Sequence, residues 1–161
     1  MQGSQEGWIE MMKCVYTIED QKVTCWEANV VPGYEITKLR ANGTVTACYN
    51  TSSTVNGSYL VGGVVGQNNK GIVTACYNAS GSIYGEVTIG GVVGENYTGT
   101  VTACYWSNYA GYGIGNGTGD ATKVDSTDVT WAYAVNTMNN ALNGSGWQYE
   151  LTGALPTLKK Q

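Results

Sequence analysis

Three tyrosines recur at a fixed interval of 28 residues, as Tyr49, Tyr77 and Tyr105. Aromatic rings in a regular row can stack on sugar rings or on the surface of a partner protein. If these rings face outward, they form an aromatic strip, which is the candidate ligand or partner surface of the chain. Ordinary packing of the surrounding strands is the competing interpretation of the same three tyrosines.

Catalytic chemistry finds little support in the residue types. The chain has no histidine, which excludes Ser-His-Asp and Cys-His mechanisms. A glycosidase needs two carboxylates across a cleft, and the repeat supplies Glu86 and Glu95 only in its second copy. Solvated surface charge is the simpler role for both. We therefore predict a non-enzymatic protein without catalytic residues or a cofactor.

Metal binding is also disfavoured. Five cysteines are an odd number, so at least one thiol is free or paired between chains, and the disulfide state stays open. Cys48, Cys76 and Cys104 occupy equivalent places, which favours packing as small buried side chains. The aspartates of GNGTGDATKVDSTD resemble an oxygen-rich calcium loop but lack the spacing and final Glu of an EF-hand. Turns and helix capping are their expected roles; they are Asp120, Asp125 and Asp128.

Composition excludes further classes of protein. Eight Lys and Arg form no basic cluster and the net charge is −4, so nucleic acid is not expected as a partner. No run of about 18 apolar residues exists, and we predict no membrane span. The first residues show no basic segment followed by an apolar one, so no signal peptide is predicted within them.

An internal repeat organises the chain. Residues 43–70 read GTVTACYNTSSTVNGSYLVGGVVGQNNK and residues 71–98 read GIVTACYNASGSIYGEVTIGGVVGENYT, identical at 15 of 28 positions without a gap. A third copy begins with GTVTACYW and departs after Tyr105. Each copy has short β-branched stretches separated by Gly-, Asn- and Ser-rich turns. The pattern predicts an all-β protein, a short β-solenoid with one 28-residue rung per repeat.

Stacked rungs place equivalent residues in ladders about 4.8 Å apart. The predicted ladders are those of Val45, Val73 and Val101, of Thr46, Thr74 and Thr102, of the three repeat cysteines, and of the three tyrosines. Strict alternation would put Val45 and Cys48 on opposite faces, although both favour the core. We therefore expect a bend or bulge near Ala47 that resets the alternation.

The flanks are expected to cover the two ends of the solenoid within a single domain, residues 1–161. Residues 1–40 form the N-terminal cap, with a β-hairpin of Lys13–Ile18 and Lys22–Glu27. The repeat region spans residues 41–119. Residues 120–161 form the C-terminal cap, a helix and a strand. Asp128 is predicted to begin the helix, and its apolar positions are Trp131, Val135, Met138 and Leu142, followed by the strand residues Trp147, Tyr149 and Leu151.

The segments GGVVGQN and GGVVGEN, residues 62–68 and 90–96, together with the following GTVTACY, resemble the GLUG repeat of large bacterial surface proteins. The same repeat occurs in the IgA1-protease family of metallopeptidases. The ending, with Met138–Leu142, Trp147 and LPTL at 155–158, is similar to the segment that closes such regions. Proteolysis in those relatives belongs to a separate zinc domain with an HExxH motif, which this chain lacks.

The resemblance implies an extracellular or cell-surface protein with a structural or adhesion role, a repeat stalk or presenting scaffold. Its partners would be proteins or glycans at the cell surface, and self-association by rung stacking is a further expectation. The chain would then be a fragment or a processed form of a larger protein. The alternative is a carbohydrate-binding module that uses the tyrosine ladder.

Overall fold

The computed structural model describes residues 43–51, 54–125 and 127–161, and before them the backbone of four strands. These are β1 (Gln5–Ile9), β2 (Cys14–Glu19), β3 (Lys22–Cys25) and β4 (Arg40–Ala41). The described residues are mostly strands with one short helix, which confirms the all-β class. No helix among them has the length and apolar character needed to cross a bilayer.

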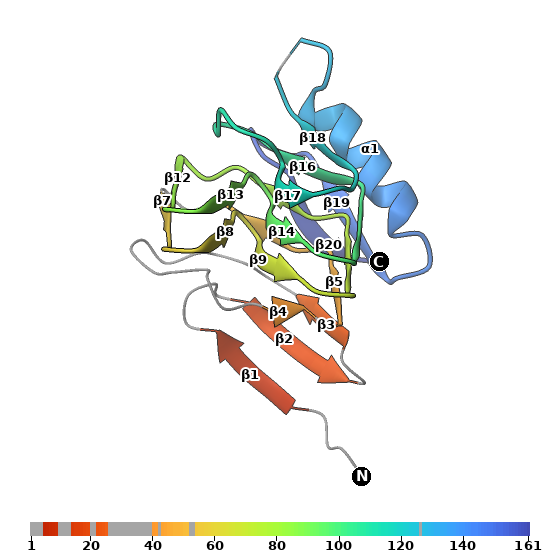
Figure 1. The fold of residues 1–161 in the computed structure, drawn as a ribbon. Coiled ribbons are helices and arrows are strands. Elements are labelled where there is room, and N and C mark those ends of the chain that lie inside the picture. The colour runs from red at the N-terminus through yellow and green to blue at the C-terminus, as the bar shows by residue number, and fades with distance from the viewer. Residues whose placement is uncertain are drawn as a thin grey trace.

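Each repeat forms one layer of short strands, and successive layers lie on one another (Figure 1). Layer 1 consists of β5 (Thr44–Thr46), β6 (Tyr49–Asn50), β7 (Thr54–Asn56), β8 (Leu60–Gly62) and β9 (Val65–Asn68). Layer 2 consists of β10 (Ile72–Thr74), β11 (Tyr77–Asn78), β12 (Ser82–Tyr84), β13 (Thr88–Gly90) and β14 (Val93–Asn96). Layer 3 consists of β15 (Thr100–Thr102), β16 (Cys104–Trp106) and β17 (Ile114–Gly117). A last strand, β18 (Ala121–Lys123), lies on β16. We call the three layers with β18 the repeat stack.

The layers pair as parallel strands in the predicted register. Val73 lies between Val45 and Val101, and Thr74 lies between Thr46 and Thr102. Tyr77 likewise pairs with Tyr49 and Tyr105. The N–H groups of Tyr77 and Tyr105 donate to the carbonyls of Cys48 and Cys76, at 3.0 and 2.9 Å, which aligns the cysteine ladder. All four predicted ladders are confirmed.

The expected bend lies at the alanine of each TACY segment. The φ angles of Ala47, Ala75 and Ala103 are 56°, 53° and 51°. A left-handed residue turns the chain so that the valine and the cysteine on either side both face the interior. This conformation costs an alanine about 1 kcal/mol, and it recurs because each layer needs the same reset. The sequence-based expectation of a bend near Ala47 is therefore confirmed.

The interior of the repeat stack is one continuous apolar cluster. It consists of repeat residues of all three layers: Val45, Cys48, Val55, Val61, Val64, Val65, Val73, Cys76, Ile83, Val92, Val93, Val101, Cys104 and Trp106. Small β-branched side chains and thiols fill the space because the layers are only about 4.8 Å apart. We call this set the interior cluster.

Layer 3 is shorter than the other two. Val65 pairs with Val93, 28 residues later, but Val93 pairs with Ile114, 21 residues later. The missing residues correspond to β12 and β13, which have no strand above them in the described part of the chain. After β17 the chain crosses the top of the core, where Gly119 lies against Val101. The shortened repeat thus covers part of its own end of the stack.

At the other end, a β-hairpin continues the first sheet. β2 pairs with β3 in antiparallel orientation, which confirms the predicted hairpin, and β1 adds to β2. β3 then pairs in parallel with β5, placing Val23 beside Val45 and Thr24 beside Thr46. The similarity of VTCW to VTACY in the sequence therefore reflects the same position in a sheet.

The C-terminal unit consists of α1 (Trp131–Ala141) and the antiparallel pair β19 (Trp147–Glu150) and β20 (Thr157–Lys160). The prediction that Asp128 caps the helix is wrong. The cap is Thr130, whose side chain accepts a hydrogen bond from the Tyr133 N–H at 3.2 Å. The backbone N–H groups of Thr127, Asp128 and Val129 instead donate to the Asp125 carboxylate, and this turn delays the start of the helix.

The C-terminal unit lies against the side of the repeat stack, as Figure 1 shows for α1 beside the upper layers. The C-terminal unit packs against the tyrosine ladder, and the two together form a second apolar cluster. The buried members are Ala47, Ala75, Tyr77, Ala79, Tyr105, Val124, Ala134, Met138, Leu142 and Tyr149. We call this set the lateral cluster. The unit thus covers a flank of the layers, whereas a cap over the last layer was expected.

Candidate functional site

The tyrosine ladder faces away from the interior cluster, but it is not an exposed strip. Tyr77 is fully buried and Tyr105 is 3% exposed, while Tyr49 is half-buried. The rings of Tyr49 and Tyr77 stack with centroids 5.1 Å apart, and Trp131 packs edge-on against Tyr77 at 4.8 Å. The three tyrosines therefore do not form the outward-facing strip that was considered as a ligand surface. The C-terminal unit, which is outside the repeat, covers them.

Hydrogen bonds hold this cover in place. The Tyr149 hydroxyl donates to the carbonyl of Ala75 at 2.9 Å and lies 3.3 Å from that of Cys48. The Tyr77 hydroxyl donates to the Pro156 carbonyl at 2.5 Å. Burial is the main cause that raises the pKa of both phenols above its usual range. Both hydroxyls therefore stay protonated, as donors must.

The cysteine ladder is equally inaccessible. Cys48, Cys76 and Cys104 are free thiols inside the interior cluster. Burial raises the pKa of Cys76 and of Cys104 well above the usual value. A neutral, buried thiol is a poor nucleophile and a poor metal ligand. Among the described residues, no group of three or more Cys, Asp or Glu side chains could hold a metal ion.

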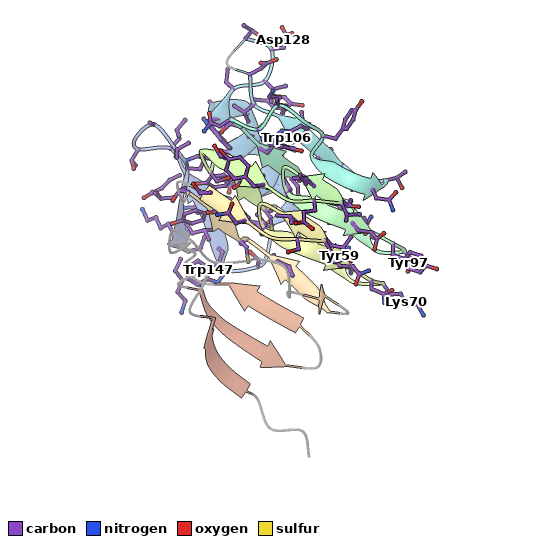
Figure 2. The ribbon with its side chains drawn as sticks, turned by 60° about the vertical axis from the view of Figure 1, so that its left-hand side comes forward. Tyr59, Lys70, Tyr97, Trp106, Asp128 and Trp147 are labelled. Atoms are coloured by element: carbon purple, nitrogen blue, oxygen red, sulfur yellow. The ribbon has the colours of Figure 1, made fainter. Side chains whose placement is uncertain are left out.

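The three aspartates of the predicted calcium-like loop have separate structural roles. The Asp120 carboxylate accepts a hydrogen bond from the Ala103 N–H at 3.0 Å. The Asp125 carboxylate accepts from the N–H groups of Thr127, Asp128 and Val129, and these bonds hold its pKa below the usual value. Figure 2 shows Asp128 on the outer loop, away from the sheets. The structure does not bring the three carboxylates into one site.

The two glutamates of layer 2 also form no pair across a cleft. Glu86 is exposed in the turn between β12 and β13. Glu95 lies on the outer face of β14, where it accepts hydrogen bonds from Gln67 at 2.7 Å and from Asn116 at 3.0 Å. Gln67, Glu95 and Asn116 therefore form a polar column across the three layers.

A groove of about 450 Å³ opens at the end of the repeat stack formed by layer 3. It is lined by Trp106, Tyr112, Ala121 and the glycine-rich residues 113–119. Tyr112 is 81% exposed on its rim, and Figure 2 shows Trp106 among the uppermost strands. Sequence reasoning missed this groove. Its signal was the point where the third repeat departs from the pattern, after Tyr105.

A second hollow, of about 430 Å³, lies between the start of α1 and the turn after β16. Trp131 and Leu155 give it an apolar wall, and Asn108 and Thr130 add polar groups. Its one charged lining residue is Asp125, whose carboxylate already accepts three backbone hydrogen bonds.

No family model, curated protein or solved structure matches this chain. The resemblance of residues 62–68 and 90–96 to the GLUG repeat stays a prediction.

Proposed function

We propose that the chain is a short β-solenoid that serves as a non-enzymatic structural module, a stalk segment or presenting scaffold at a bacterial cell surface. The observation that carries this proposal is the in-register pairing of three successive repeats, which sets the equivalent valines, threonines and tyrosines in columns. Such a stack is quasi-one-dimensional, and its length is set by the number of repeats. A spacer needs this property.

The packing supports a rigid element. The interior cluster runs without interruption through the layers, and Asn side chains bind the layers together at their edges. Asn68 donates from its side chain to the Asn96 side chain at 2.9 Å, and Asn96 donates to the Thr118 carbonyl at 2.6 Å. Each of these two amides thus donates a hydrogen bond to the next layer, which helps to fix the register of neighbouring strands.

The rival function, carbohydrate binding by the tyrosine ladder, loses the observation on which it rested. A sugar ring cannot stack on Tyr77 or Tyr105 while the C-terminal unit covers them. Non-enzymatic character remains part of our proposal, supported by the absence of histidine from the sequence and by the buried, neutral thiols. Surface location and protein or glycan partners belong to the same proposal.

The proposal is tested by inserting one and then two further copies of residues 71–98 between Thr98 and Gly99. We expect folded proteins that lengthen by about 4.8 Å per copy, measured by small-angle X-ray scattering. The C-terminal unit can move with the added layer because the TACYN segment that it contacts recurs in each copy.

A matched control inserts a scrambled 28-residue copy at the same point, which should form a loop without lengthening the stack. Equal scattering profiles for the two insertions would contradict the solenoid. Hydrolytic turnover that copurifies with the unmodified chain would contradict the non-enzymatic structural role.

A further inference from the structure

The last layer of the repeat stack is only partly covered. In one sheet, β18 already lies on β16 as the start of a fourth layer. In the neighbouring sheet, whose order is β17-β14-β9-β4, β17 is the outermost strand of the described residues. The groove lined by Tyr112 and residues 113–119 lies at this vacant place. One strand set on β17 would extend the fourth layer that β18 begins.

Backbone donors at this place have lost their acceptors. In layer 1, the N–H groups of Val64 and Val65 both donate to the Val92 carbonyl of the layer above, at 2.9 and 3.0 Å. In layer 2, those of Val92 and Val93 donate to the Gly113 carbonyl, at 2.8 and 3.1 Å. Gly113 and Ile114 hold the same positions in layer 3, where the described chain places no layer above them.

The edge also lacks the features that normally prevent strand addition. Natural edge strands carry Lys, Pro or inward-pointing charges. Residues 105–119, YWSNYAGYGIGNGTG, contain no charged residue and no proline. Ile114 is half-buried and Gly115 and Asn116 are exposed, so the backbone of β17 is accessible. This edge is open to pairing with another strand.

The columns below the vacancy specify what fits it. Val65, Val93 and Ile114 form an apolar column, and two residues further Gln67, Glu95 and Asn116 form the polar one. Between them, a Cβ on Gly94 would lie 2.5 Å from the Gly66 carbonyl oxygen, so that position requires glycine. We propose that β17 is a docking site for one extended strand of a partner protein with the pattern apolar, Gly, polar, Asn. It would bind by parallel strand addition.

A second folded copy of this chain does not supply such a strand. Its own matching strands, β9 and β14, are paired on both sides. Head-to-tail stacking is also obstructed, because the first sheet has the order β1-β2-β3-β5-β10-β15. Setting β4 of a second copy on β17 would set its β3 on β15, so that its β2 and β1 would overlap β15 and β10. These overlaps favour a separate partner and disfavour self-association by stacking.

The test uses a synthetic peptide with the sequence of residues 89–97, IGGVVGENY, as the probe. Titration into the ¹⁵N-labelled full chain should shift the amide signals of Gly113, Ile114 and Asn116, and should slow their hydrogen exchange at least about tenfold. The control peptide carries proline in place of the glycine that corresponds to Gly94. It lacks one ladder N–H and should bind at least about tenfold more weakly.

Two variants at one position sharpen the test. Ile114→Pro removes the N–H that faces the vacancy and should weaken peptide binding at least about tenfold, whereas Ile114→Val should retain it. If Ile114→Pro fails to fold, the two peptides on the unmodified protein still decide. Equal binding of both peptides, no binding, or shifts confined to β20 would overturn the proposal. Dimers of the protein alone, abolished by Ile114→Pro, would overturn it in favour of a second copy. None of these results bears on the lengthening experiment.

Discussion

The two apolar clusters of this protein follow different rules. Apart from Trp106, the buried members of the interior cluster are valines, isoleucine and cysteines at recurring repeat positions, so layers 1 and 2 offer each other nearly the same surface. The lateral cluster joins repeat residues, such as Ala75 and Tyr77, to side chains that occur once, such as Met138 and Tyr149. The first can be extended by adding copies, whereas the second depends on particular pairs. The interior cluster therefore builds the repeat stack, whereas the lateral cluster attaches the C-terminal unit that covers one flank of it.

The largest expected effect on stability comes from a substitution that disrupts the interior of the repeat stack. Gly94→Ala would place a methyl group 2.5 Å from the Gly66 carbonyl oxygen and 2.8 Å from the Val61 nitrogen. Both are backbone atoms of the layer below, so the layers must separate. We expect a loss of about 3 kcal/mol in the free energy of unfolding, measured by urea denaturation.

The control for this variant is Gly153→Ala, where an added methyl meets nothing within 4 Å. It should change the stability by less than about 0.5 kcal/mol. Similar stabilities for the two variants would contradict the close approach of the layers.

The next largest effect comes from a substitution that weakens the lateral cluster and leaves the interior cluster unchanged. Tyr149→Phe removes the hydroxyl that donates to Ala75 and leaves a buried carbonyl without that donor. We expect a loss of about 2 kcal/mol by urea denaturation. Tyr133→Phe is the matched control, since Tyr133 is exposed on α1. Equal losses for the two variants would show that the hydroxyl does not fasten the C-terminal unit.

The pH dependence of stability reports on the interior thiols. Burial raises the pKa of Cys76 and Cys104 in the folded state. Their contribution is therefore complete below the unfolded pKa of about 8.5 and is lost as the pH rises above it. The free energy of unfolding should fall by up to about 1.4 kcal/mol per pH unit for each thiol.

The Cys76→Ala, Cys104→Ala double variant should show a shallower decline between about pH 8.5 and 10, before tyrosine ionisation dominates. A slope unchanged by these substitutions would mean that the two thiols titrate normally and are not enclosed by the layers.

The smallest effect concerns the start of α1. Thr130→Ala removes the side-chain acceptor for the Tyr133 N–H and should cost about 1 kcal/mol. Asp128→Ala should change the stability by less than about 0.5 kcal/mol. The reverse order, measured by thermal unfolding, would restore Asp128 as the helix cap.

The features that recur with the 28-residue repeat could be predicted from the sequence. The valine, threonine, cysteine and tyrosine ladders follow from identical spacing, and the bend at Ala47 follows from the need to bury both Val45 and Cys48. The N-terminal hairpin was likewise visible, from two strand-like segments around Glu19-Asp20-Gln21.

The sequence did not predict the cover on the tyrosines or the place of the helix start. Periodicity within α1 shows that one face is apolar, but not which surface that face meets. Tyr149 reaches the Ala75 carbonyl across 74 residues, a pairing with no counterpart in the repeat. The groove was missed because it arises from an absence, the residues by which layer 3 is shorter than layer 2.

The register of the layers is the central claim, and hydrogen-bond scalar couplings measure it directly. In a ¹⁵N,¹³C-labelled sample, we expect the amide of Tyr77 to couple to the carbonyl carbon of Cys48, and the amide of Tyr105 to that of Cys76. Coupling of either amide to a carbonyl at another offset, or to one within its own layer, would contradict the stacked repeat.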